Sequence, residues 1–190
     1  MRPFAERFPR LFHVADRAAL PSIRQHGLRS AASLCRLHGV PAAARSALLD
    51  ENRGAYAPIA SGVALRWQGM RDEPLARRLV PGLDPVSWRR LINSRVFLFA
   101  RRADADRLRA REQARDQVIL GFATAALLSA GLDLRACRYN NGYMDRRSLA
   151  APRLRGPDDY VPAAGWGPGV PREVTVADAI PCQIDFELCA

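Results

Sequence analysis

The first thirty residues change from an apolar strand pattern to a helical pattern. Residues 11–15 (Leu-Phe-His-Val-Ala) have the composition of a short strand. Residues 17–26 follow with helical spacing, with Asp16 expected as the N-cap and Gly27 as the stop signal. The chain is therefore predicted to begin with a strand followed directly by a helix.

Apolar residues also recur with helical spacing in much of the next third of the chain. This spacing predicts helices over residues 31–38, 42–51 and 84–92, the last with Asp84 as its cap and Pro85 in its first turn. Residues 52–74 are broken by glycine and proline, so we expect a surface loop with a short strand at 63–67. A short helix is expected at 75–80.

The second half alternates short apolar runs with turns. Strands are predicted at residues 95–100, 117–122, 134–139, 173–176 and 181–186, and short helices at 104–110 and 124–130. Residues 140–171 are rich in Asn, Gly, Pro and Arg and are expected to form a long loop region. This order lacks a regular strand–helix–strand rhythm and predicts an α+β fold in a single domain, residues 1–190, with a helical or irregular insertion at about 40–92.

The charge changes this picture only in part. The net charge is +10, which favours partners rich in phosphate such as nucleic acid. All 29 basic residues are Arg, however, and the chain contains no Lys. Such a complete replacement suggests a biased genome composition, so some of the basicity carries no functional meaning.

Cysteine usage and hydropathy exclude several classes of protein. The cysteines at positions 35, 137, 182 and 189 lack zinc-binding spacing with each other or with the histidines, so we expect reduced thiols and no metal site. The start of the chain lacks the apolar core of a signal peptide, and the longest apolar run is too short to cross a bilayer. We therefore expect a soluble cytoplasmic protein without a membrane partner.

Common catalytic and nucleotide-binding motifs are absent from the sequence. There is no phosphate-binding loop, and the glycines at 165, 167 and 169 do not lead from a strand into a helix as a dinucleotide fingerprint requires. Neither GxSxG nor HExxH occurs. A Cys–His nucleophilic pair remains open, because such partners need not be close in sequence.

Three segments together resemble a known superfamily. They are Phe-His-Val at 12–14 with the run Leu-Pro-Ser-Ile-Arg-Gln-His-Gly-Leu-Arg-Ser at 20–30, Asn-Ser-Arg-Val-Phe-Leu-Phe at 93–99, and Pro-Arg-Glu-Val-Thr-Val at 171–176 running to Ile-Pro at 180–181. In this order they resemble the ADP-ribosyltransferase superfamily, in particular DarT-type DNA-targeting toxins and related uncharacterised bacterial domains. The resemblance implies a split, twisted β core with surrounding helices, and NAD as co-substrate.

The resemblance also assigns roles. It makes Glu173 the catalytic carboxylate, because breaking the bond between ribose and nicotinamide creates a positively charged, oxocarbenium-like centre that a carboxylate stabilises. It places His13 at the ribose hydroxyls and gives the backbone of Val14 to the nicotinamide carboxamide. Without the motif, His13 would be read as a structural residue and Glu173 as a solvated charge.

Further candidates follow from the chemistry of NAD. Phe97 or Tyr139 could stack on the nicotinamide ring, and Asn140 or Asn141 could line the site, although core packing for Phe97 and a turn at residues 139–142 are the commoner explanations. Arg66, Arg95 and Arg111 are candidates for the pyrophosphate. The loop before Glu173 is a substrate-loop candidate, where Tyr160 and Trp166 could contact the target, with Trp166 stacking on a base or plugging the edge of the core.

Several functions stay open at this stage. The leading hypothesis is an enzyme that transfers ADP-ribose to a macromolecule, with nucleic acid as one acceptor, and the likeness to toxins raises an antitoxin or immunity protein as a partner. A non-catalytic nucleic-acid-binding or interaction module on the same fold is the alternative, motivated by Ala15 where the toxins have Thr. An RNA 2′-phosphotransferase-like activity is the third reading and would need several arginines at the site.

Overall fold

The computed structural model describes residues 2–140 and 154–189. Its helices there are α1 (Phe4–Arg7), α2 (Leu20–His26), α3 (Ala31–Leu37), α4 (Ala42–Leu49), α5 (Asp72–Ala76), α6 (Pro85–Asn93), α7 (Arg102–Arg111) and α8 (Thr124–Ser129), with short 3-10 turns η1 (Arg17–Ala19), η2 (Pro157–Asp159) and η3 (Ala163–Gly165). Its strands are β1 (Arg10–Asp16), β2 (Leu28–Arg29), β3 (Ala57–Ala60), β4 (Val63–Leu65), β5 (Arg95–Leu98), β6 (Gln117–Ala123), β7 (Arg135–Cys137), β8 (Val161–Pro162), β9 (Glu173–Ala177), β10 (Ala179–Ile180) and β11 (Phe186–Cys189).

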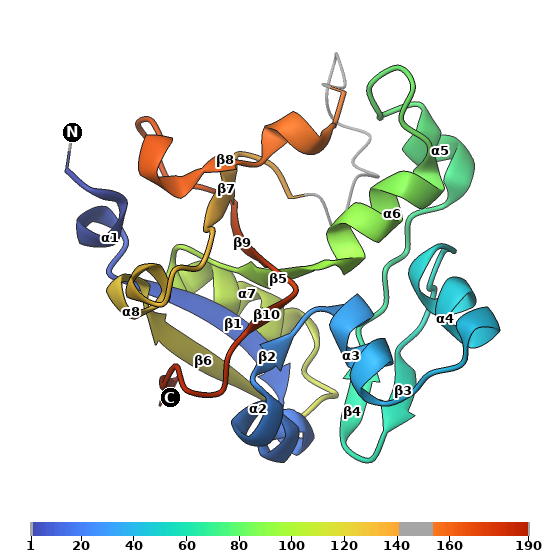
Figure 1. Cartoon of the computed structure of the whole chain (residues 1–190), viewed down its shortest axis with the longest axis horizontal. Coiled ribbons are helices and arrows are strands. Elements are labelled where there is room, and N and C mark those ends of the chain that lie inside the picture. Colours follow the sequence, from blue (N-terminus) through green and yellow to red (C-terminus); the bar gives the residue numbers. More distant parts are fainter. Residues whose placement is uncertain (1, 141–153, 190) are drawn as a thin grey trace.

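Two antiparallel sheets form the framework (Figure 1). The first sheet has the order β1-β6-β11 and the second the order β5-β9-β7-β8. They touch at one edge, where Phe12 of β1 and Phe99 just after β5 exchange backbone hydrogen bonds of 2.8 and 2.7 Å. The smaller pairs β2–β10 and β3–β4 complete the strand pairing in the described residues.

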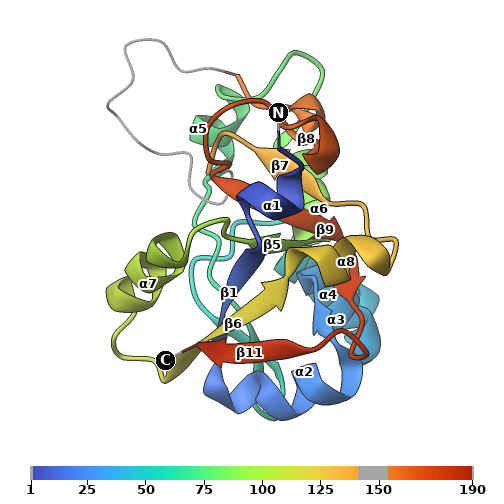
Figure 2. The same cartoon turned by 90° about the vertical axis from the view of Figure 1, so that its left-hand side faces the viewer.

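The main core lies where apolar side chains of both sheets meet. Alternation along each strand sends Leu11 and Leu120 from the first sheet, and Val96 and Val174 from the second, into one buried cluster. Helix α7 covers the other face of the first sheet, where Ala105 packs with side chains of β1 and β6 (Figure 2). Helix α6 covers the other face of the second sheet. The result is a layered arrangement of helix, sheet, sheet and helix.

Residues 40–92 form α4, the β3–β4 hairpin, α5 and α6, and lie mainly on the right in Figure 1. This region encloses two arginines whose charge is met by backbone carbonyls. Arg53 donates from Nε to the carbonyl of Arg66 at 2.7 Å, and Arg89 donates from Nη1 to the carbonyl of Asp50 at 3.0 Å. A buried guanidinium is tolerated when its N–H groups are paired in this way.

Most of the predicted elements lie where the sequence pattern placed them, and the exceptions have identifiable causes. Strand β3 was not expected because Pro58 argues against a strand; here it lies in a two-stranded hairpin whose register shifts beside it. Helix α5 was expected at 75–80 but begins at Asp72. The predicted strand at 181–186 is wrong, because the chain turns there between β10 and β11. Asp16 precedes η1 without capping it.

The class of the fold is mixed helix and sheet of the α+β kind, as the sequence pattern predicts. Across residues 2–140 and 154–189, no helix is both long and apolar enough to cross a membrane. The same residues contain no cluster of three or more His, Cys, Asp or Glu side chains that could hold a metal ion.

Candidate functional site

His13 lies where the two sheets begin to separate. Its Nδ1 is 2.8 Å from the carbonyl oxygen of Phe97 in β5. Because a carbonyl only accepts, Nδ1 carries the proton and Nε2 of the neutral ring keeps a lone pair. Burial lowers the pKa of His13 to about 4, with the positive charge of Arg66 adding to the effect and the bond to Phe97 opposing it. The ring is therefore a neutral hydrogen-bond acceptor at physiological pH.

The backbone N–H and C=O of Val14, a residue that is 5% exposed, lie at the edge of β1 that faces away from β6. Phe12 directs its N–H and C=O at β5, away from β6. In an antiparallel strand alternate residues direct these groups to the same edge, so Val14 presents its donor and acceptor there too. Among the described residues no backbone group pairs with Val14 at that edge. A planar amide could therefore bind to both groups at once.

Glu173 is the first residue of β9 and is buried. Thr175 lies opposite Phe97 in the pairing of β9 with β5, so the side chains of Glu173 and Phe97 share a face of the second sheet. On its other side Glu173 pairs in register with Cys137 of β7. The carboxylate thus belongs to the strand next to the one that holds the His13 ring.

Arg66 comes from the segment after β4 and is held by a polar network beside β1. Its guanidinium lies 3.4 Å from Glu112, just beyond α7. Glu112 also accepts hydrogen bonds from the Tyr56 hydroxyl and, at 2.9 Å, from Gln117 Nε2. Since the charge of Arg66 acts on His13, this is the one of the three predicted pyrophosphate arginines that the described residues bring to the His13 side of the gap.

A protein-family model matches almost the whole chain and identifies its family. The profile of a family described as "Family of unknown function (DUF7002)" matches residues 9–186. The chain belongs to this family. The match runs from just before β1 into β11 and so includes both His13 and Glu173 of this DUF7002 member. No curated protein and no solved structure matches the chain.

The other two predicted arginines have different surroundings, and their assignment to the pyrophosphate stays a prediction. Arg95 donates from Nη1 to Thr175 Oγ1 at 3.2 Å, and its guanidinium lies 4.9 Å from the centre of the Tyr160 ring. Burial lowers its pKa. Arg111 is exposed at the end of α7. Cross-strand packing occupies the first of these side chains, and the second points into solvent.

The aromatic and amide candidates lie at the second sheet. Phe97 is half-buried and packs against the cluster under α6, while its carbonyl holds His13. Tyr139 lies two residues beyond Cys137, and the Arg155 guanidinium stacks on its ring at 3.7 Å. Asn140 is exposed at the end of the first described stretch, and Asn141 lies outside the described residues. Tyr139 thus lies near Glu173 of the second sheet. Phe97 contacts His13 through its carbonyl, whereas its side chain lies on the same sheet face as Glu173.

The substrate-loop candidates are core residues in the structure. Tyr160 is 3% exposed and Trp166 is 5% exposed. The Trp166 indole N–H donates to the carbonyl of Gly169 at 3.1 Å, and its ring packs with the main core. Neither ring presents a free face on which a base could stack, so these two residues shape the loop before Glu173 rather than reach a target from it.

Sequence reasoning missed two residues that lie close to these groups. Burial lowers the pKa of the Arg155 guanidinium, and nearby acidic groups oppose this, Asp159 most strongly and Glu173 among the others. Trp67 follows Arg66 directly and is exposed. Arg155 follows a long polar stretch without any pattern, but the Arg-Trp pair at 66–67 is a basic and aromatic combination that could have been noticed.

Proposed function

We propose that this protein is an NAD-dependent ADP-ribosyltransferase with an ADP-ribosyltransferase-like split β core, and that its acceptor is a macromolecule. One observation carries the proposal. Strands β1 and β5 are bridged at Phe12 and Phe99 and then part, and the neutral ring of His13 lies in the gap. The gap offers hydrogen-bonding groups of both kinds within two adjacent residues.

His13 and Val14 match the nicotinamide riboside half of NAD. The Nε2 lone pair of His13 would accept a hydrogen bond from a ribose hydroxyl. The N–H and C=O of Val14 would pair with the carbonyl and amino group of the nicotinamide carboxamide. Arg66 would pair with the pyrophosphate, since it is the arginine whose charge reaches His13.

Glu173 would supply the catalytic carboxylate. As the bond from ribose C1′ to the pyridinium nitrogen breaks, its electron pair leaves with nicotinamide and positive charge develops on the ribose. The carboxylate would bind the 2′-hydroxyl, stabilise that charge, and take the proton from the incoming acceptor nucleophile. Burial of Glu173 would strengthen each of these interactions, because a low local dielectric increases electrostatic forces.

Nucleic acid is the acceptor class that the net charge of +10 favours. Many arginines are already paired, however, for example Arg101 and Arg107 with Asp104 around α7. A binding module without catalysis on this fold, or an RNA 2′-phosphotransferase-like activity, would use the same basic surface. The binding module would release no nicotinamide from NAD, and the phosphotransferase would release it only with an RNA that carries a 2′-phosphate. Nicotinamide release with an unphosphorylated acceptor is therefore the deciding measurement.

The test is nicotinamide release from NAD, alone and with single-stranded DNA or RNA. Glu173→Gln should lower the rate by about 100- to 1,000-fold while NAD affinity changes by only a few fold, because the carboxylate acts mainly in the transition state. His13→Ala should weaken NAD binding in isothermal titration. Glu187 on β11 forms an exposed ion pair with Arg10 on β1, so Glu187→Gln is the matched control and should keep wild-type activity.

The outcome that removes the proposal is equally definite. If folded Glu173→Gln releases nicotinamide at the wild-type rate, Glu173 is not the catalytic carboxylate. If the wild-type protein neither binds nor cleaves NAD with either nucleic acid present, the non-catalytic module replaces the enzyme. Salt-dependent retention of the oligonucleotide would then be its expected property.

A further inference from the structure

Four arginines gather at one end of the second sheet. Because β5, β9 and β7 are antiparallel neighbours, the end of β5, the start of β9 and the end of β7 lie together. Arg101 follows β5 after a short bend, Arg172 directly precedes β9, and Arg138 directly follows β7. Arg107 of α7 reaches the same place through Asp104. These four residues, Arg101, Arg107, Arg138 and Arg172, are called the sheet-end arginines below.

One carboxylate serves three of these arginines. Arg101 donates from Nε to Asp104 Oδ2 at 2.8 Å, Arg107 donates to Oδ1, and the Arg172 guanidinium lies 3.6 Å from Oδ1. The Asp104 side chain is buried beneath arginines that stay about half-exposed. Three cations and one anion leave a surplus of two positive charges. Arg138 is exposed and forms no ion pair with a described residue, so the surplus becomes three.

The same surplus does not occur in the other ion pairs of the protein. Among the described residues, every ion pair that does not involve α7 joins one arginine to one carboxylate, as in Arg17 with Asp116 and Arg36 with Asp178. An arginine-rich composition supplies basic residues all over a surface, but it does not by itself gather four of them around a single carboxylate. The concentration of charge at this end therefore needs its own explanation.

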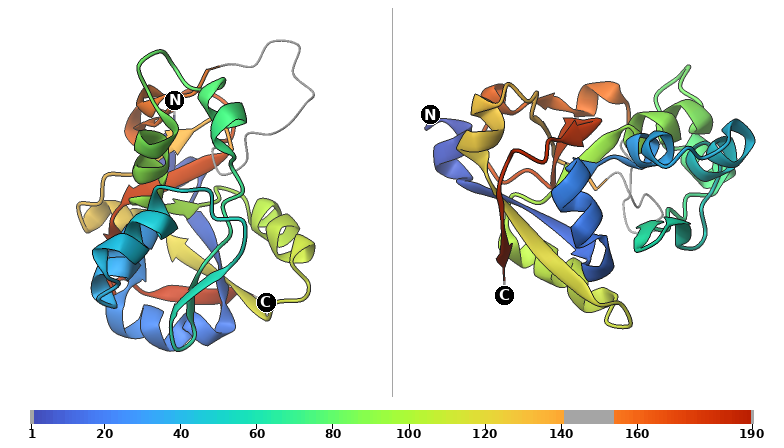
Figure 3. Two further views of the ribbon diagram at one scale, coloured as in Figure 1. Left: turned by 90° about the vertical axis from the view of Figure 1, so that its right-hand side faces the viewer. Right: turned by 60° about the horizontal axis from the view of Figure 1, so that its bottom comes forward.

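The sheet-end arginines also keep hydrogen-bond donors for a ligand. Arg101 uses Nε and Nη2 on Asp104 and leaves Nη1. The Arg172 guanidinium donates no hydrogen bond to any residue within 2–140 or 154–189. Helix α7 stands on the side of the strands away from α3 and α4, so these helices do not cover its arginines (Figure 3, left). A planar guanidinium with free N–H groups suits the oxygens of a phosphate.

We propose that the sheet-end arginines bind the phosphate groups of a nucleic-acid strand. Neighbouring strands are about 4.8 Å apart, so the row from Arg101 across β9 to Arg138 covers about 10 Å and can meet more than one phosphate. Arg172 is exposed whereas Glu173 is buried, so this surface lies beside the proposed NAD site and not within it. The choice of nucleic acid over an acidic protein rests on the proposed function, whereas the anion-binding surface does not.

The test is the salt dependence of binding to a short labelled single strand of DNA or RNA, followed by fluorescence anisotropy with the full chain. Each phosphate contact that is lost should lower the slope of log affinity against log salt by about 0.7, so the double variant Arg138→Gln with Arg172→Gln should lower it by about 1.4. At low salt its affinity should fall by about 10-fold.

The matched control is the double variant Arg17→Gln with Arg36→Gln. It removes the same net charge from two exposed ion pairs elsewhere on the surface and should bind the strand within about 2-fold of the wild type. Urea unfolding of both double variants confirms that they are folded. Equal loss of affinity in the two would mean that only net charge matters, and the proposal would be wrong.

Two further results would overturn the proposal. If the wild type does not bind either strand at low salt, the surface is not one for nucleic acid. If polyglutamate displaces the labelled strand as readily as unlabelled strand does, the surface fits acidic proteins instead. Nicotinamide release by the wild type with NAD tests the enzyme separately: a protein that binds the strand through these arginines but never cleaves NAD keeps this surface and loses only the proposed activity.

Discussion

His13 differs from a surface histidine in both its charge and its tautomer. The carbonyl of Phe97 fixes the proton on Nδ1, and burial keeps the ring neutral well below pH 6. A protonated ring would carry a donor on Nε2 and could no longer accept from a ribose hydroxyl. The surroundings of this residue, rather than its type, therefore decide what it can bind.

The first consequence is a pH dependence of stability. The folded-state pKa of His13, about 4, lies below its ordinary value of 6.5, so the unfolded chain binds more protons between these two pH values. Its contribution to stability is therefore complete above pH 6.5 and is lost as the pH falls toward 4. The loss should amount to about 3 kcal/mol at most, since one pKa unit corresponds to about 1.4 kcal/mol.

Urea unfolding at pH 4.5, 5.5 and 7.5 measures this effect. In His13→Gln the free energy of unfolding should fall less steeply with acidification than in the wild type. Comparison at pH 7.5, where the wild-type ring is neutral, separates the cost of the substitution from the proton-linked term. Equal slopes in the two proteins would mean that His13 does not titrate differently on folding.

At the residue scale, the sequence motifs singled out some residues of the candidate site and not others. Motifs within predicted strands point to His13, Val14 and Glu173. The alternation of side chains along a strand helps to predict which of its residues share a face. Arg66 could not be separated from Arg95 and Arg111, because its position depends on a contact with Glu112 that is 46 residues away in the chain. Long-range pairing of this kind leaves no local pattern to read.

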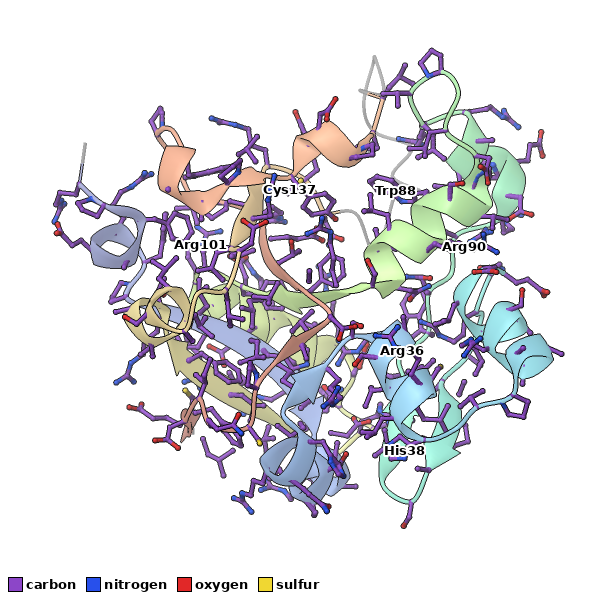
Figure 4. The ribbon with its side chains drawn as sticks, in the orientation of Figure 1. Arg36, His38, Trp88, Arg90, Arg101 and Cys137 are labelled. Carbon is purple, nitrogen blue, oxygen red and sulfur yellow. The ribbon has the colours of Figure 1, made fainter. Side chains whose placement is uncertain are left out.

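Helix α6 shows how one element can carry two adjacent arginines with opposite roles. Arg89 is 1% exposed and donates to backbone carbonyls, including that of Asp50 at 3.0 Å, whereas Arg90 is exposed and forms an ion pair with the Asp50 carboxylate at 2.7 Å. Figure 4 shows Trp88 and Arg90 on opposite sides of α6. Of these two adjacent arginines, Arg89 is therefore an interior hydrogen-bond donor and Arg90 a surface ion-pair partner.

Substitution of these neighbours should separate the two roles. Arg89→Leu should lower the free energy of unfolding by about 2–4 kcal/mol, because it leaves the carbonyls of Asp50 and Met70 buried without this donor. Arg90→Leu is the matched control and should cost less than about 1 kcal/mol, as exposed ion pairs do. Urea unfolding measures both, and equal losses would contradict the assignment of Arg89 as an interior residue.

Elements were predicted best where one local signal dominates. Helix α6 has Asp84 as a side-chain cap and Pro85 in its first turn, and its boundaries were predicted to within one residue. Strands β1, β5 and β6 have dense apolar composition and were also found. Helix α5 was displaced in the prediction because its start depends on the acidic pair Asp72 and Glu73 rather than on apolar spacing. Local composition does not show whether the helix begins at residue 72 or at residue 75.

On the scale of the whole molecule, the N-terminal segment secures the loop that leads to Glu173. Arg7 of α1 donates to the carbonyls of Trp166, Gly167 and Gly169 at 2.9, 2.8 and 3.0 Å. Phe4 and Phe8 anchor the same segment in the main core. A single side chain therefore joins α1 to the loop before β9.

Arg7→Ala should loosen this loop without unfolding the protein. We expect faster amide exchange at Gly167 and Gly169 and faster proteolysis between residues 165 and 172, because the carbonyls of Trp166 and Gly167 lose the Arg7 donor and that of Gly169 keeps only the Trp166 indole. Arg10→Ala removes an exposed partner of Glu187 and serves as the control, with the loop unchanged. If both variants exchange alike, the loop is held by Trp166 alone.

The contacts of Arg7 also affect how the protein folds during translation. The residues that Arg7 binds are made 159 to 162 positions later, and β5 gains its neighbour β9 only when residues 173–177 have been translated. A nascent chain that stalls earlier contains His13 but lacks Glu173. The candidate site is therefore assembled only after β9 has been made, so a shorter nascent chain lacks the carboxylate on which the proposed activity depends.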